Sequence, residues 1–278
     1  MTRRLPDFLL IGATKCGTTS LHRWLIGHPK IWMPAEKELR YFTTEHHFHR
    51  GPDWYAAQFA AAPADAVVGE ASNAYTRHPV YDGVPARIAA TLPRAKLIYV
   101  TRDPISRIES HYRHCLVTGI EWRGPNRALR ADPRYVAASL YGHQLAQYLA
   151  HFPPSQILVL QSEALFADPQ AQLDRLARFL GIDATAGPAF RPENVTAIRR
   201  VAPWPLRRLA AFPRAKVRAK AWAAGLARSP VAHLLATADQ PAFDLDADLR
   251  AELAGRFAED ARLLEQLLPN TALQEMPA

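Results

Sequence analysis

The sequence has few cysteines and no long apolar segment. Only Cys16 and Cys115 occur among its 278 residues. This low content excludes a disulfide-stapled scaffold and favours a reducing compartment. No apolar run reaches transmembrane length, and residues 8–11 are too short a run for the core of a signal peptide. We therefore expect a soluble, cytoplasmic protein.

Acidic residues are also scarce relative to basic ones. The chain has 26 Asp and Glu against 34 Lys and Arg, for a formal net charge of +8. A positive excess suits a polyanionic partner, whether nucleotide, anionic glycan, nucleic acid or membrane surface. Charge alone does not choose among these partners.

Hydrophobic residues make up 49 % of the chain, enough for a sizeable core. Apolar runs and amphipathic stretches alternate from residue 8 to residue 180. That order predicts an α/β fold, with a P-loop-type parallel sheet flanked by helices on both faces. We expect a single domain over residues 1–278, in which a core (7–182) carries a packed C-terminal helical segment (194–278).

The stretch from residue 8 to residue 25 predicts a strand, a tight loop and the start of a helix. Gly12 and Gly17 allow close backbone approach to a phosphate, and the loop amides and helix dipole form an anion site. The glycines have Walker A spacing, but Thr18 stands at the lysine position and Lys15 lies inside the loop. The loop therefore departs from that of nucleotide kinases.

A second anion-binding pattern begins at the end of a predicted buried strand, residues 96–101. Arg102 stands where parallel strands place ligand-binding side chains, and Asp103 with Pro104 starts a helix. Ser110 follows Arg102 by eight residues, so both could face one ligand. A Walker B strand would end in a magnesium-binding aspartate, whereas this one ends in Thr101 and Arg102.

Together these patterns resemble the sulfotransferases that use 3′-phosphoadenosine-5′-phosphosulfate (PAPS). The loop Lys15-Cys16-Gly17-Thr18-Thr19 resembles their 5′-phosphosulfate loop. The segment from Arg102 to Tyr112 matches R-D-P-x-x-R-x-x-S-x-Y, which resembles their 3′-phosphate segment. Lys37 and Glu38, before Tyr41 and Phe42, resemble a segment of heparan-sulfate and other carbohydrate-type members. The Ala, Arg and Pro content adds a hint of a bacterial source.

The resemblance implies a role for each matching residue. The donor's 5′ end would lie on Lys15, Cys16, Gly17, Thr18, Thr19 and Ser20. Arg102 and Ser110 would hold its 3′-phosphate, whereas Arg107 is expected to be structural. Lys15 would stabilise charge on the departing phosphate and Glu38 would accept the acceptor's proton, with Glu36 as the fallback. No metal is required.

The same resemblance places substrate-binding side chains at Lys37, Arg40, Glu70 and Ser72. Two positions depart from the family pattern. Thr14 stands where some members have proline, and Ala71 replaces a lysine that often positions the sulfonate. Lys37 is the residue expected to compensate for Ala71.

No acidic residue occurs between residues 194 and 238, a stretch rich in arginine and lysine. Three interpretations stay open for it. It could cap the cofactor and substrate cleft through Arg199 and Arg200, form a basic surface for an anionic membrane or glycan, or be a solvated basic face.

The sequence therefore predicts a PAPS-dependent sulfotransferase that acts on a hydroxyl or amine acceptor. Carbohydrate-type motifs favour a glycan, while a lipid, a small metabolite or a peptide tyrosine stays open. No nucleic-acid partner is expected, and the oligomeric state is not predicted. Two alternatives remain at this point. One is a P-loop kinase using ATP and Mg²⁺, and the other is a non-catalytic polyanion-binding module.

Overall fold

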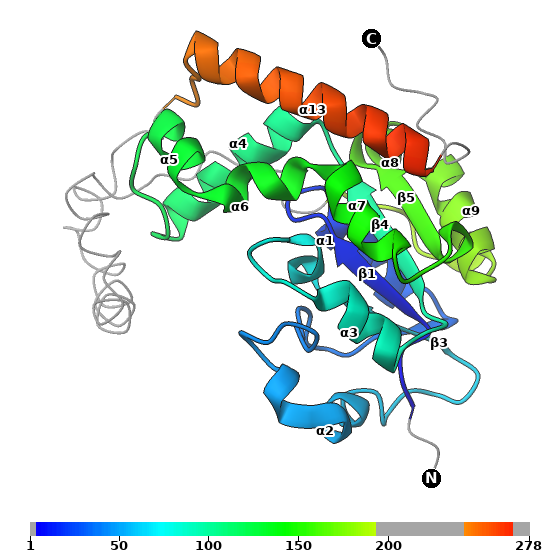
Figure 1. Ribbon diagram of the computed structural model, residues 1–278. Coiled ribbons are helices and arrows are strands. Elements are labelled where there is room, and N and C mark those ends of the chain that lie inside the picture. The colour runs from blue at the N-terminus through cyan, green and yellow to red at the C-terminus, as the bar shows by residue number, and fades with distance from the viewer. Residues whose placement is uncertain (1–3, 193–241, 269–278) are drawn as a thin grey trace, which may run out of the picture.

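The computed structural model describes residues 4–192 and 242–268 (Figure 1). Within them the centre is a sheet of five parallel strands in the order β2-β3-β1-β4-β5. The strands are β1 (Phe8–Gly12), β2 (Ile31–Trp32), β3 (Val67–Ala71), β4 (Lys96–Thr101) and β5 (Ile157–Gln161). The predicted parallel α/β sheet is confirmed.

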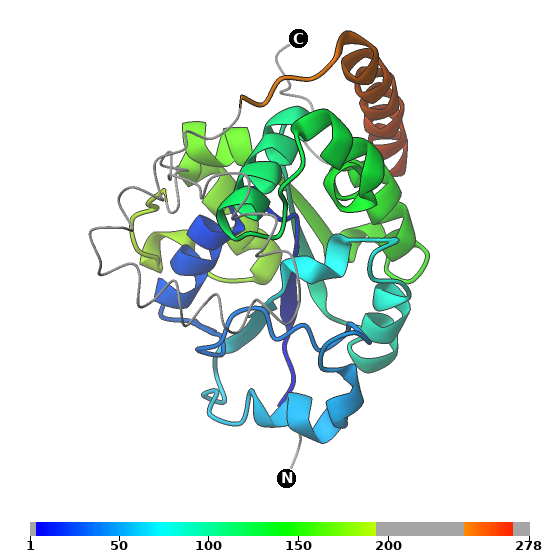
Figure 2. The same cartoon turned by 90° about the vertical axis from the view of Figure 1, so that its left-hand side faces the viewer.

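Helices cover both faces of this sheet. Figure 2 shows α1 (Thr18–Gly27) and α9 (Pro169–Leu180) on one side of β1, with α3 (Val84–Thr91) and α7 (Tyr141–Leu149) on the other. The remaining α-helices before residue 193 are α2 (Gly51–Ala57), α4 (Pro104–Val117), α5 (Pro125–Ala131), α6 (Pro133–Val136) and α8 (Ser162–Ala167). Because both faces are covered, the strands are buried along nearly their whole length, rather than alternating between buried and exposed residues.

Strand β1 lies in the middle of the sheet, and every one of its residues is buried. Its register sets Phe8 opposite Gly69 of β3 and Lys96 of β4. A Cβ atom added at Gly69 would lie 2.1 Å from the Phe8 ring, so glycine is required there for the two strands to pair. This packing fixes the strand that leads into the predicted phosphate loop.

The region between β4 and β5 is helical but interrupted. Helix α5 lies in the polar stretch at residues 121–133. The amphipathic stretch at residues 135–152 does not form one continuous helix, because a 3₁₀ turn (Ala137–Ser139) separates α6 from α7. The break has a tertiary cause, because the Ser139 hydroxyl accepts a hydrogen bond from the buried Arg107 guanidinium.

The last described helix, α13 (Ala247–Leu267), lies along α7, as Figure 1 shows. The Asp260 carboxylate accepts hydrogen bonds from the first amides of α7, from Gly142 N at 2.9 Å and from His143 N at 2.8 Å. The apolar side chains of α13 join two buried clusters, one over the sheet and one with α4 and α5. Within the C-terminal segment, α13 is thus packed on the core.

In the described part of the chain, no helix is both long enough and apolar enough to cross a bilayer. The basic stretch at 194–238, including Arg199 and Arg200, lies outside the described residues.

Candidate active site

The loop between β1 and α1 forms an open anion cradle. Gly17 begins α1 with a left-handed backbone (φ 84°), and Lys15 is also left-handed (φ 73°). No side chain caps the N-terminus of α1, and no acidic residue stands in its first turn. The helix therefore presents amide donors and the positive end of its dipole to an anion, as the sequence predicts.

Side chains of the loop differ in what they can offer a ligand. Cys16 is fully buried, its thiol lies 3.7 Å from the Tyr141 hydroxyl, and burial raises its pKa to about 12. Cys16 therefore places its thiol in the core, and its amide donates within the loop to the Ala13 carbonyl at 3.3 Å. Thr18 and Ser20 are buried, whereas Thr19 is partly exposed.

Lys37 brings a cation to the start of α1. Its Nζ lies 3.5 Å from both the Thr19 hydroxyl and the Thr18 carbonyl oxygen. Burial lowers the pKa of Lys37, and the charge of Glu38 opposes that shift. The expected role of Lys37, to compensate for the missing lysine at Ala71, stays a prediction.

Arg102 connects the second predicted motif to the loop. It follows β4, and its Nη1 donates to the Lys15 carbonyl at 3.3 Å. Asp103 caps α4 by accepting a hydrogen bond from Ser106 N at 2.8 Å, so the predicted helix start is confirmed. Ser110 lies on the same helix and is 9 % exposed. Strand, loop and helix thus converge at the carboxyl edge of the sheet.

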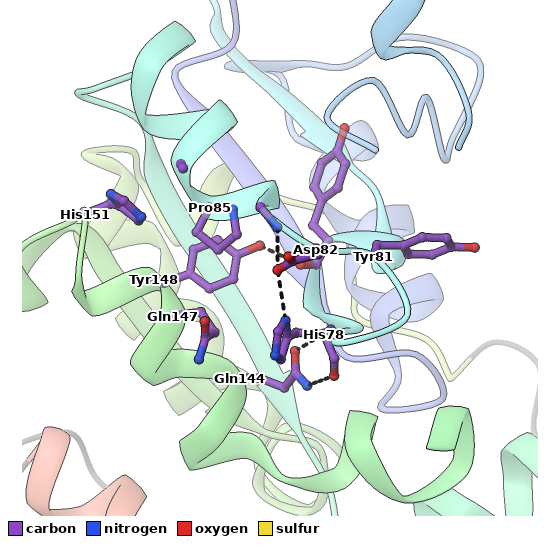
Figure 3. Close-up of a pocket in the computed structure, with 11 residues that line it drawn as sticks. His78, Tyr81, Asp82, Pro85, Gln144, Gln147, Tyr148 and His151 are labelled. Atoms are coloured by element: carbon purple, nitrogen blue, oxygen red, sulfur yellow. Dashed lines mark hydrogen bonds and ion pairs between the residues drawn. The ribbon is translucent and has the colours of Figure 1, made fainter. Parts of the chain in front are cut away.

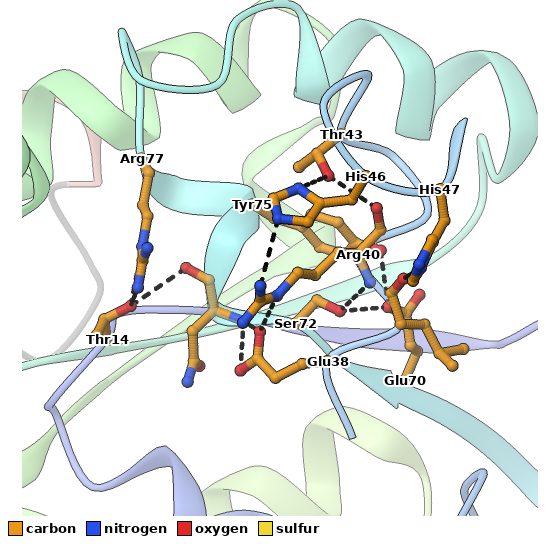
Figure 4. A network of polar contacts seen from close by, with 12 residues as sticks. Thr14, Glu38, Arg40, Thr43, His46, His47, Glu70, Ser72, Tyr75 and Arg77 are labelled. Carbon is orange, nitrogen blue, oxygen red and sulfur yellow. Dashed lines mark hydrogen bonds and ion pairs between the residues drawn. The ribbon is translucent and has the colours of Figure 1, made fainter. Parts of the chain in front are cut away.

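Glu38 occupies a strained backbone position (φ 66°), and its amide donates to the Ala71 carbonyl at 2.9 Å. Its carboxylate accepts the Asn73 amide at 3.1 Å and 3.2 Å and lies 3.5 Å from Arg40 Nε (Figure 4). The side chain stays 24 % exposed, enough to meet an acceptor. Glu36, the fallback base, is exposed.

Glu70 and Ser72 lie beneath this segment. The Glu70 carboxylate is buried and accepts hydrogen bonds from the hydroxyls of Tyr55 (2.5 Å), Ser72 (2.6 Å) and Tyr75 (2.7 Å). Burial raises its pKa, while these bonds oppose the shift. Ser72 Oγ in turn accepts the Arg40 amide at 3.0 Å, as Figure 4 shows. Ser72 thus connects the buried Glu70 to the main chain of Arg40, and direct substrate contact by Glu70 or Ser72 stays a prediction.

Two further residues of this region were not singled out from the sequence. Arg77 donates to the Thr14 hydroxyl from Nη2 at 2.8 Å and from Nε at 3.2 Å. His111, the neighbour of Ser110, is 4 % exposed, and in the described part of the chain its buried Nδ1 makes no hydrogen bond. Arg77 belongs to no motif, and His111 stands at a variable position of the Arg102–Tyr112 pattern, so the sequence gives no signal of either feature.

A small pocket of about 70 Å³ lies elsewhere, between α3 and α7 (Figure 3). His78 and Asp82 form an ion pair at its wall, Nδ1 to Oδ1 3.2 Å. None of the residues predicted for the transfer site lines it. In the described residues, no group of three or more His, Cys, Asp or Glu side chains could hold a metal ion.

The parallel α/β fold, with two predicted anion-binding motifs at the carboxyl ends of its strands, defines a class of nucleotide-binding folds, and comparison with known proteins gives the family. Residues 5–201 match the model of the sulfotransferase domain, so the chain belongs to the sulfotransferase domain family. It is similar to human bifunctional heparan sulfate N-deacetylase/N-sulfotransferase 3, at 30 % identity over 198 residues. Human bifunctional heparan sulfate N-deacetylase/N-sulfotransferase 2 is 31 % identical to the chain over 200 residues.

Each of these alignments covers 64 % of this chain but 22 % of the relative, so the chain matches about a fifth of those longer proteins. Among solved structures, a sulfotransferase from Alicyclobacillus acidocaldarius is 25 % identical, with 96 % of both chains covered and a TM-score of 0.66. The sulfotransferase domain of the Synechococcus PCC 7002 olefin synthase is 18 % identical, covers 93 % of this chain and 96 % of its own, and has a TM-score of 0.51. The latter supports the fold alone.

Proposed function

We propose that the protein transfers the sulfuryl group of PAPS to a hydroxyl or amine of a carbohydrate. One observation carries the proposal: Asn73 joins the phosphate loop to Glu38. Its carbonyl accepts the Thr14 hydroxyl at 3.5 Å, and its amide donates to the Glu38 carboxylate. A proton acceptor is thereby held next to the loop that would carry the departing phosphate.

The residues present suit the donor. The amides of the cradle and Lys15 would hold the 5′-phosphosulfate, and Lys37 adds a cation at the α1 N-terminus. Arg102 and Ser110 would take the 3′-phosphate with a guanidinium fork and a hydroxyl. PAPS supplies the activated sulfuryl group, and the absence of a side-chain cap on α1 leaves room for its anion.

The reaction is an in-line displacement at sulfur. The acceptor oxygen or nitrogen forms a bond to sulfur while the bond from sulfur to the bridging phosphate oxygen breaks. The acceptor's proton passes to Glu38, and the electron pair of the broken bond stays on the phosphate. Lys15 and the loop amides stabilise the charge that develops there.

The names of the relatives support a glycan acceptor, because two similar proteins are named as heparan sulfate N-sulfotransferases. Partial coverage of those proteins leaves N- or O-sulfation to experiment. Membership of the sulfotransferase domain family favours sulfuryl over phosphoryl transfer, so sulfuryl transfer is preferred to the kinase alternative.

Calorimetric titration of the protein with 3′-phosphoadenosine-5′-phosphate (PAP), and separately with ATP and Mg²⁺, tests the donor. We expect tight PAP binding that Arg102→Ala weakens by about 10- to 100-fold, from the loss of charge-assisted hydrogen bonds. Arg94→Ala is the matched control, because Arg94 is exposed and precedes β4 at the opposite edge of the sheet. Preference for ATP and Mg²⁺ would instead identify a kinase.

Turnover is then measured as PAP release in the presence of glycan acceptors. Lys15→Ala should lower kcat by about 10²–10³, the usual cost of removing a main electrostatic donor. Near-normal turnover of a folded Lys15→Ala protein would reject the assigned mechanism.

A further inference from the structure

Arg77 places a positive charge at Thr14 of the phosphate loop. It follows the 3₁₀ turn Asn73–Thr76, and two of its guanidinium nitrogens are used on the single Thr14 oxygen. No carboxylate lies within ion-pair distance of Arg77 among residues 4–192 and 242–268. Figure 4 shows its guanidinium at Thr14. Its Nη1 makes no hydrogen bond within this described part.

The charges around Arg77 do not balance. Burial lowers the pKa of Arg77, and Glu38, Arg40 and Arg107 are the charged residues that act on it. Glu38 is the one carboxylate of this set, and it is already shared with Arg40 at 3.5 Å. Arg40 and Arg77 therefore place two guanidinium charges near one carboxylate, Glu38, and both arginines are partly exposed, so a further anion can reach them.

A second polar atom within range of these charges lacks a partner. In the described part of the chain, His111 Nδ1 is buried and makes no hydrogen bond, which costs about 1–3 kcal/mol. Burial, followed by the charges of Arg107 and Arg77, lowers the pKa of His111 well below its usual value. The positive charge of Arg77 and Arg107 therefore helps to keep this imidazole neutral.

We propose that Arg77, together with Arg40, forms an anion-binding subsite beside Glu38, so that the reacting hydroxyl or amine of the acceptor lies next to a carboxylate or sulfate group. This inference rests on the proposed function and narrows its acceptor to an anionic one. Guanidinium groups suit this task, because their fixed donors match the geometry of both anions.

The same chemistry could serve the sulfuryl group of the donor instead, and the two sources give different results. An acceptor subsite acts on acceptor affinity and leaves PAP binding unchanged. A donor subsite would change kcat equally for charged and neutral acceptors.

The experiment compares two matched probes. One is an oligosaccharide of alternating glucuronic acid and N-unsubstituted glucosamine, and the other is its carboxyl-reduced form. Binding is measured by calorimetry with PAP present, and kcat and KM are measured by PAP release. The proteins are wild type, Arg77→Gln, Arg77→Lys, Arg40→Gln and the control Arg94→Gln, each checked by thermal unfolding.

We expect wild type to bind the carboxylated probe more tightly than the reduced one. Arg77→Gln should weaken carboxylated-probe binding by roughly 10- to 100-fold, the loss of a hydrogen bond to a charged group, with PAP affinity unchanged. Arg77→Lys should restore part of the loss, and Arg94→Gln should show none. Equal wild-type affinity for both probes, or an Arg77→Gln defect in kcat that ignores acceptor charge, would overturn the proposal.

Failure of the carbohydrate assignment is distinguishable from failure of this subsite. If PAP binds but neither oligosaccharide does, the glycan acceptor is wrong. Two small phenols then replace the oligosaccharides as probes of the subsite. 4-Hydroxybenzoate and 4-hydroxybenzamide share one acceptor hydroxyl, and only the benzoate carries the carboxylate charge. A preference for the benzoate that Arg77→Gln abolishes supports the subsite, and no preference rejects it.

Discussion

Arg107 reaches from α4 to the phosphate loop, where its Nη1 donates to the Thr14 carbonyl at 3.4 Å. It is fully buried, and its other nitrogens bond the Ser139 hydroxyl and the Tyr135 carbonyl. One side chain therefore connects the loop to the broken helix between β4 and β5. The structural role predicted for Arg107 agrees with this position.

Arg107→Lys should destabilise the protein, because an ammonium keeps the buried charge but loses the fork that reaches all three acceptors. We expect the free energy of unfolding to fall by about 1–3 kcal/mol, measured as a lower urea midpoint. Arg130→Lys is the control. Arg130 lies in an exposed pair with Asp248, so its replacement should cost about 0.5 kcal/mol or less. Equal urea midpoints for the two variants would contradict a stabilising role of the three Arg107 contacts.

Glu38→Gln should remove the proton acceptor and keep the hydrogen bond from Asn73, because the amide oxygen accepts equally well. We expect kcat to fall by about 10²–10⁴ with unchanged PAP affinity. Glu36→Gln, two residues earlier and exposed, should retain activity. The opposite result, with Glu36 essential and Glu38 dispensable, would transfer the base to Glu36.

His22 should make the protein sensitive to mild acid. Burial, with the charges of Lys37 and Arg23, lowers its pKa from 6.5 to about 4. Between these pH values His22 is protonated in the unfolded chain but neutral in the folded protein. The free energy of unfolding therefore decreases as the pH falls below about 6.5. His22→Gln should reduce the loss between pH 7 and pH 5 by about 2 kcal/mol, measured by urea unfolding at each pH. An unchanged pH slope in a folded variant would contradict this assignment.

Neither cysteine should react readily in the folded protein. Burial raises the pKa of both thiols, to about 12 for Cys16, and the thiolate is the reactive form. At pH 8 we expect no labelling of native protein by iodoacetamide, full labelling of both in urea, and unchanged PAP binding after native treatment. Mass spectrometry reads the labelled positions. Rapid native labelling of Cys16 would place its thiol in the cradle after all.

The parts of the site that the sequence predicts are those built by local rules. Gly17 at the start of α1 follows from glycine spacing, and the Arg102 position follows from a strand that ends before Asp103 and Pro104. These features need few residues of context. The central strand β1 is predictable for the same reason, because its apolar run is unbroken.

The parts that escape prediction depend on residues far apart in the chain. The buried Glu70 carboxylate accepts hydrogen bonds from Ser72 and Tyr75 of the turn that follows it, but also from Tyr55, fifteen residues earlier on α2, and the spacing does not predict that contact. Strand β2 has two residues and exists through pairing with β3. The break before α7 follows from Arg107, and the position of Arg77 follows from Thr14, sixty-three residues earlier. Tertiary contacts override local propensity in each case.

The carboxylate of Asp260 carries a consequence for where the protein can be cut. The family match ends at residue 201, but the amide donors that open α7 are satisfied from α13, far beyond that point. Loss of α13 would leave those amides bare and expose the apolar side chains it buries over α4 and α5. We therefore expect the part of the chain that folds cooperatively to extend beyond residue 201, where the family match ends. We expect a chain stopped at residue 201 to aggregate or to resist refolding, and one stopped after residue 268 to unfold as a single transition.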